Sequence, residues 1–224
     1  MRAALIALLL SSPAAAQGVF DMGALTNTLS VEATRQSEAA RAAPAPAANA
    51  FRFQATPEQR KRNLQQFVEK TRAVDPAGAG QLEALFAGND VIALIGKGIA
   101  PYGLRVDDLA DAYTVYWVSA WMASRGLAGA NDKGQVAAVR RQSAAAMAAV
   151  PALKTATDAQ KQEFAEALLV QAMLLDASVG QAQGDPAKLE QVKAAARQGA
   201  KASGLDLDAF ELTPAGFVKA APKR

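Results

Sequence analysis

The sequence predicts one all-α domain of six to seven helices, with a single central apolar helix and a short extended segment near the C-terminus. Two observations carry this prediction. Apolar residues recur at helical spacing from about residue 57 onward, and capping residues precede most of these runs. No repeat period, coiled-coil heptad or convincing β-hairpin signal interrupts the helical pattern.

The first predicted helix covers residues 57–74. Thr56 is followed by a proline and, three positions on, by Gln59, which is the pattern of a capping box at a helix start. The pair Asp75-Pro76 is expected to end this helix, because the residue before a proline disfavours helical geometry.

Two shorter helical pieces are predicted next. One covers residues 81–86. Asp90 is expected to cap the other, over residues 91–99, because an aspartate at this position can accept hydrogen bonds from the free amides of the first turn. Pro101 and Gly103 close this second piece.

The strongest helical signal covers residues 107–124. Its apolar residues occupy most of the helix circumference, which predicts a helix buried in the middle of the domain. One face carries Leu109, Tyr113, Tyr116, Trp117, Ala120 and Trp121, and another carries Val115, Val118 and Met122.

Three more helices and a tail complete the predicted domain. An Ala-rich helix is predicted over residues 135–150, and a capping box at Thr157 opens a long helix that runs beyond Val179. The last helix begins at Pro186 and ends at Gly204. Residues 205–212 then alternate between apolar and acidic, which predicts one short strand or an extended packing arm.

The N-terminal residues 1–16 have the pattern of a cleaved signal peptide. A positive start precedes an apolar run too short to span a bilayer, and Ala14-Ala15-Ala16 supplies the small residues that cleavage requires. Residues 17–50 are rich in alanine and proline and predict a flexible arm. We therefore expect an exported protein, periplasmic or extracellular, with a helical domain over residues 51–218 and a basic tail over residues 219–224.

Composition excludes several kinds of chemistry. The chain has no histidine and no cysteine, so disulfides, thiol nucleophiles, histidine bases and cysteine-based zinc sites are impossible. The formal net charge of +3 is too small to predict nucleic-acid binding. No cofactor, no metal and no transmembrane segment after signal cleavage are predicted.

Three acids, Asp107, Asp108 and Asp111, are the best candidates for catalysis. They lie within one turn of the predicted helix, so paired carboxylates can share a proton or hold a hard cation. The favoured interpretation is structural, because acids in a first helical turn stabilise the positive end of the helix dipole. Asp111 sits a turn further in and is expected to be partly buried beside an arginine. The candidate partners are Arg60, Arg62 and Arg105.

Aromatic residues of the same helix are candidates for ligand binding. Tyr113, Trp117 and Trp121 could line a groove for a sugar or an apolar ligand. At helical spacing, however, such residues more often form core, and the surrounding apolar positions favour that interpretation.

Three segments together resemble an uncharacterised family of exported bacterial helical proteins, a domain of unknown function. They are Arg62-Asn63-Leu64-x-x-Phe67 leading to Asp75-Pro76, then Gly103-Leu104 with Asp107-Asp108-Leu109-Ala110-Asp111-Ala112 and the aromatic run to Trp121, and finally Gly204 with Leu205, Leu207 and Leu212-Thr213-x-x-Gly216-Phe217. The resemblance covers residues 52–218. It implies an all-α exported domain and carries no established activity.

The sequence therefore predicts an exported module with a binding or structural role, and a protein or cell-envelope component as its partner. The alternative is a carboxylate-dependent hydrolase acting on an envelope glycan through one of the three acids with Tyr113. Such an enzyme needs a second acid across a cleft, for which Glu163 and Asp176 are candidates. A secreted effector or inhibitor is a third possibility. The oligomeric state is left open.

Overall fold

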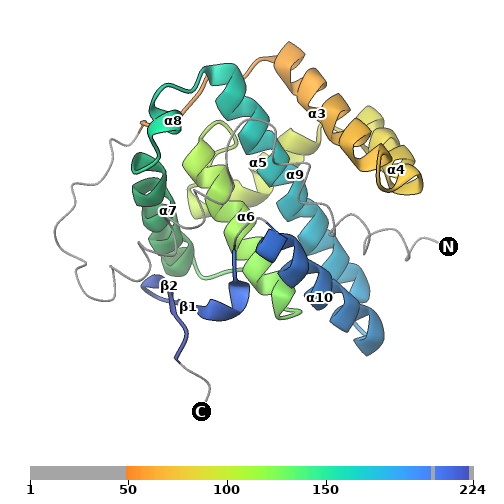
Figure 1. The fold of residues 1–224 in the computed structure, drawn as a ribbon, viewed down its shortest axis with the longest axis vertical. Helices are drawn as coiled ribbons and strands as arrows, with labels where there is room; N and C mark the ends of the chain where they lie inside the picture. The colour runs from red at the N-terminus through yellow and green to blue at the C-terminus, as the bar shows by residue number, and fades with distance from the viewer. Residues whose placement is uncertain (1–48, 203–204, 222–224) are drawn as a thin grey trace.

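The computed structural model describes residues 49–202 and 205–221 and confirms the predicted all-α class (Figure 1). Its helices are α3 (Pro57–Arg72), α4 (Pro76–Gly88), α5 (Val91–Ile99), α6 (Leu109–Ser124), α7 (Lys133–Ala148), α8 (Pro151–Lys154), α9 (Asp158–Ala182) and α10 (Pro186–Ala202). Two short 3₁₀ turns, η2 (Ala100–Tyr102) and η3 (Leu207–Ala209), and strands β1 (Phe210–Thr213) and β2 (Gly216–Lys219) complete the described part. The predicted signal peptide and nearly all of the predicted arm lie outside these residues.

Helix α6 is the centre of the fold, as its apolar circumference predicts. Thirteen of its 16 residues are buried, and it packs against α7, α9 and α10 (Figure 1). Tyr113 and Trp117 are 1% and 0% exposed and join Leu168 and Leu169 of α9 in the main core. Among the residues described, no helix combines the length and hydropathy needed to cross a bilayer.

Helices α3 and α4 form an antiparallel pair that packs on α9 through a second apolar cluster. Phe67, Leu82, Ile92 and Val170 are members of this cluster, and the rings of Phe67 and Phe86 meet edge to face at 6.4 Å. The predicted piece over residues 81–86 is wrong in extent, since α4 begins at Pro76. Asp75 precedes this proline and caps α4 by accepting from the Gly78 amide at 2.9 Å.

The C-terminal segment forms a β-hairpin that the sequence analysis did not predict. β1 and β2 pair antiparallel around a two-residue turn, with Leu212 opposite Phe217. Gly216 follows the turn with φ +96°, a conformation that disfavours other residues. Gln142 of α7 donates to the Phe217 carbonyl at 2.7 Å and accepts from its amide at 2.9 Å. The Phe217 ring stacks on Trp117 at 4.4 Å, so the hairpin closes the main core.

A buried carboxylate joins α3 to α9. Glu166 is 2% exposed and accepts hydrogen bonds from Arg60 Nε at 2.9 Å, Asn63 Nδ2 at 2.6 Å and Gln162 Nε2 at 3.0 Å. The Gln162 amide also donates to the Thr56 carbonyl at the start of α3. Because every donor reaches the same buried group, the network fixes how α3 sits on α9.

We expect Arg60→Ala to lower the free energy of unfolding by about 2 kcal/mol, because it removes the cation that pairs with the buried Glu166 carboxylate. The loss is limited because Asn63 and Gln162 still donate hydrogen bonds to Glu166. Arg62→Ala is the matched control. Its side chain is exposed, and its hydrogen bond within the described residues is to Gln59, so its loss is expected to cost no more than about 0.5 kcal/mol. Urea unfolding of both variants measures the difference, and equal effects would contradict the role given to Glu166.

Candidate functional site

Two of the three acids named from the sequence are held inside the fold. Asp108 is the N-cap of α6 and accepts from the Ala110 and Asp111 amides at 2.9 and 3.2 Å. Asp111 accepts from Arg140 Nε at 2.8 Å and from the Arg105 amide at 2.9 Å. Burial raises the pKa of Asp111, and the Arg140 guanidinium opposes that rise. Both carboxylates therefore have structural partners.

Asp107 lies at the surface beside these two. Arg105 donates to both of its oxygens at 2.8 Å, and Arg52 donates to one of them at 3.4 Å. The Arg105 hydrogen bonds hold the pKa of Asp107 below its usual range. Asp107, Arg52 and Asp158 line a shallow, open hollow in which the acid is already paired.

The cation expected beside Asp111 comes from an element that the sequence analysis did not consider. Arg60 pairs with Glu166, and Arg62 bonds to Gln59. Arg105 reaches Asp111 with its backbone amide only. The guanidinium is that of Arg140, on the Ala-rich helix α7, where no spacing relation to Asp111 marks it in the sequence.

The three aromatic candidates lie in or on the core. Tyr113 and Trp117 are fully buried and meet edge to face at 6.3 Å. Trp121 is half-buried, donates from Nε1 to the Phe210 carbonyl at 2.9 Å and carries the Arg125 guanidinium over its ring at 4.1 Å. All three rings contact other parts of the chain.

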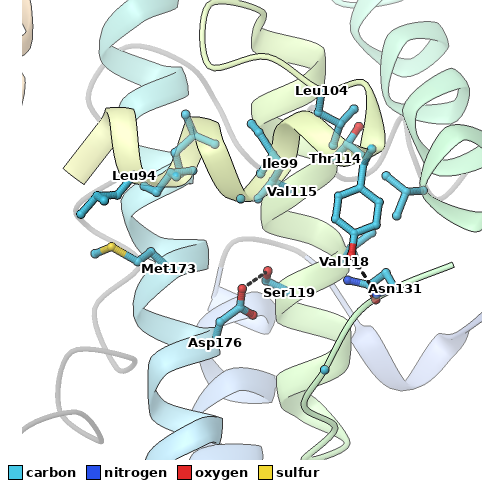
Figure 2. Close-up of a pocket in the computed structure, with 16 residues that line it drawn as sticks. Leu94, Ile99, Leu104, Thr114, Val115, Val118, Ser119, Asn131, Met173 and Asp176 are labelled. Carbon is cyan, nitrogen blue, oxygen red and sulfur yellow. Dashed lines mark hydrogen bonds between the residues drawn. The ribbon is translucent and has the colours of Figure 1, made fainter. Parts of the chain in front are cut away.

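A cavity of about 390 Å³ lies where α5 crosses α6 and α9 (Figure 2). We call it the α5–α6–α9 cavity. Its walls are mainly aliphatic, and Leu94, which is 52% exposed, stands at its rim. The lining residues are Leu94, Ile95, Gly98, Ile99, Tyr102, Leu104, Thr114, Val115, Val118, Ser119, Gly129, Asn131, Val136, Leu169, Met173 and Asp176. None of Asp107, Asp108, Asp111 and Glu163 is among them.

Asp176 is the one carboxylate in this lining. Figure 2 shows it on α9 facing Ser119 of α6, whose hydroxyl donates to Oδ2 at 3.2 Å. Asp176 is an exposed residue, yet nearby protein atoms desolvate its carboxyl group and raise its pKa to about 6. Solvent exposure together with a desolvated carboxyl group is expected of an acid that lines an open cavity. The Ser119 hydrogen bond only partly opposes the rise.

The other polar atoms of the cavity are mostly engaged. Thr114 is fully buried, donating to the Ala110 carbonyl at 2.7 Å and lying 3.0 Å from the Ser143 hydroxyl. The Tyr102 hydroxyl accepts from the Asn131 amide at 3.1 Å. Across the described ranges, no group of three acidic side chains converges as metal ligands. The cavity can therefore enclose an apolar body and meet a polar head at Asp176.

Comparison with known proteins places the chain in a family. The sequence model of a family of unknown function (DUF6683) matches residues 1–219. The chain belongs to this family. No curated protein and no solved structure matches the chain significantly. Membership of the family confirms the resemblance to an uncharacterised domain and transfers no activity to Asp176 or to the three acids.

We expect Arg140→Met to destabilise this family member by about 3 kcal/mol near neutral pH, because it leaves two buried carboxylates without a cation. Arg140 opposes the raised pKa of Asp111, so its loss lets that pKa rise further. A raised folded-state pKa means that stability falls as pH increases, so the loss is larger at about pH 7.5 than at about pH 5. Exposed Arg141 provides the matched control. A loss independent of pH, measured by urea unfolding, would contradict this account.

We expect Asp176→Asn to stabilise the fold at about pH 7.5, because the folded state holds the Asp176 proton up to about pH 6 and ionisation above that pH costs stability. The gain is discounted for solvent access to about 1 kcal/mol, or about 2–4 °C in Tm. It disappears below about pH 3, where the aspartate is protonated in both the folded and the unfolded state. Asp185→Asn is the control, because Lys188 lowers the pKa of that partly exposed acid and neutralising it gives no gain.

Proposed function

We propose that this protein is an exported, non-catalytic binding module whose ligand occupies the α5–α6–α9 cavity. The observation that carries the proposal is the cavity itself. Its volume of about 390 Å³ lies in the range of roughly 300–1,000 Å³ typical of small-molecule sites. Aliphatic walls with a few polar groups are also the usual composition of such sites. Export rests on the signal-peptide pattern of residues 1–16.

The three acids at the start of α6 support a role without catalysis. Asp108 accepts two backbone amides, Asp111 has Arg140, and Asp107 has Arg105. A general acid or base needs a proton that it can exchange with a bound substrate. Each of these carboxylates instead holds the start of α6 to a neighbouring segment.

The hydrolase alternative keeps one favourable observation, the pKa of about 6 at Asp176. An acid that titrates close to neutrality can donate a proton to a leaving group. Glycoside hydrolysis, however, uses two carboxyl groups about 5–9.5 Å apart on either side of the bond. Asp176 is the one carboxylate in the cavity lining, and the walls are aliphatic. Binding is therefore the better supported function.

The cavity can be blocked from a position where a larger side chain has room. Gly98 of α5 borders the cavity, and a Cβ atom there meets nothing within 4 Å. Gly180 of α9 has the same open surroundings, is also helical, and is absent from the lining. Leucine favours a helix over glycine by up to about 1 kcal/mol, so both substitutions leave the fold intact.

We expect Gly98→Leu to weaken binding of the neutral apolar dye N-phenylnaphthylamine by about tenfold or more, because the leucine occupies volume the dye requires. Gly180→Leu is expected to leave the dye affinity within about twofold. Fluorescence titration measures both. Equal affinities of the two variants, or no dye binding by the wild type, would overturn the cavity as the binding site. Hydrolysis of an envelope glycan that Asp176→Asn abolishes would favour the hydrolase instead.

A further inference from the structure

The chemistry of the cavity specifies the charge of its ligand. Asp176 receives one side-chain hydrogen bond, from Ser119 to Oδ2. Among residues 49–202 and 205–221, no lysine or arginine lies within ion-pair distance of it. A hydroxyl donor leaves the negative charge of the carboxylate in place, so the cavity holds an uncompensated anion above about pH 6.

Neighbouring charged groups are directed elsewhere. Tyr102 is the other titratable side chain in the lining, and its phenol hydroxyl accepts from the Asn131 amide. Lys97, on α5, is absent from the lining. In the described part of the elements packed around α9, the ion pairs are Arg140 with Asp108 and Asp111, Arg60 with Glu166 and Asp90, Arg72 with Glu69 and Glu83, Lys188 with Asp185, Lys193 with Glu190 and Arg197 with Asp208.

We propose that the α5–α6–α9 cavity binds an amphiphilic organic amine, whose ammonium group pairs with Asp176 and whose aliphatic body lies between α5 and α6. This inference rests on the proposed binding function and specifies its ligand class. An ammonium donates up to three hydrogen bonds, so it can fill the acceptor sites that Ser119 leaves open. The aliphatic body meets Ile95, Val118 and Leu169, which need no polar partner.

The positions of Asp176 and of the aliphatic wall favour one orientation of the ligand in the cavity. In Figure 2, Asp176 and Ser119 lie below α5 in the view, whereas Leu94 and Ile99 lie on α5 itself. An amine head at Asp176 therefore directs the chain of the ligand toward α5. An anionic amphiphile in the same orientation would place two negative charges together, which disfavours its binding.

Three probes of equal chain length test the inference: octylamine, octanol and octanoate. At about pH 7.5, wild-type protein is expected to bind octylamine at least about tenfold more tightly than octanol, and octanoate least tightly, because only the amine supplies a charge-assisted hydrogen bond. Asp176→Asn is expected to bring amine and alcohol within about twofold of each other while leaving the octanol affinity within about twofold of wild type. Isothermal titration calorimetry gives all six affinities.

The same titration at about pH 5 tests the charge of Asp176 separately, because the aliphatic walls of the cavity do not change with pH. Protonation of Asp176 removes its charge there, so the preference of the wild type for octylamine over octanol is expected to disappear. Equal binding of amine and alcohol by the wild type at about pH 7.5, or a preference retained in Asp176→Asn, would overturn the amine inference and leave the binding function standing. Failure of all three probes and of the neutral dye would overturn both.

Discussion

Burial of α6 is the constraint on which the rest of the structure depends. Most polar side chains of a helix surrounded on nearly all sides need partners inside the protein, because an unpaired buried group costs about 1–3 kcal/mol. Asp111 finds Arg140 of α7, Thr114 bonds within α6 and lies beside Ser143 of α7, and Ser119 finds Asp176 of α9. These contacts define which face of each neighbouring helix packs on α6. The hairpin then closes the remaining side through Phe217 and Trp117.

The helices were predictable where local chemistry determines them. Caps at Thr56, Asp90 and Thr157 and the apolar pattern of α6 depend on residues a few positions apart, so the sequence displays them directly. The start of α4 was mispredicted because Asp75-Pro76 satisfies two rules at once: it ends one helix and begins the next. The hairpin was missed because what secures it is Gln142, 75 residues away, which binds both backbone groups of Phe217.

In the candidate site too, the sequence shows groups that are adjacent in the chain but not groups that the fold brings together. Asp107, Asp108 and Asp111 attract notice because they are adjacent in the sequence, and adjacency at a helix start is also what capping produces. The cavity has no such signature, since its walls come from α5, α6 and α9, and the Ser119–Asp176 pair joins positions 57 residues apart. From the sequence, Asp176 could be named only as a candidate for the second acid of a hydrolase. Its importance becomes visible when the fold brings it beside aliphatic walls.

Comparison of Asp111 with Asp176 shows why the cavity, rather than the acid cluster, is the place for a ligand. Desolvation raises the pKa of both carboxylates, although Asp111 is buried and Asp176 is an exposed residue. Asp111 accepts hydrogen bonds from the Arg140 guanidinium and the Arg105 backbone amide, so the chain itself supplies its partners. Within the described residues, Asp176 accepts a hydrogen bond from the Ser119 hydroxyl alone, and it lies beside the open volume and aliphatic side chains of the cavity. A charge left in that condition opposes folding at neutral pH, and a cation from outside the chain would offset the cost. The described part of the chain therefore leaves Asp176 without an internal cation, and the ligand would supply the missing positive charge.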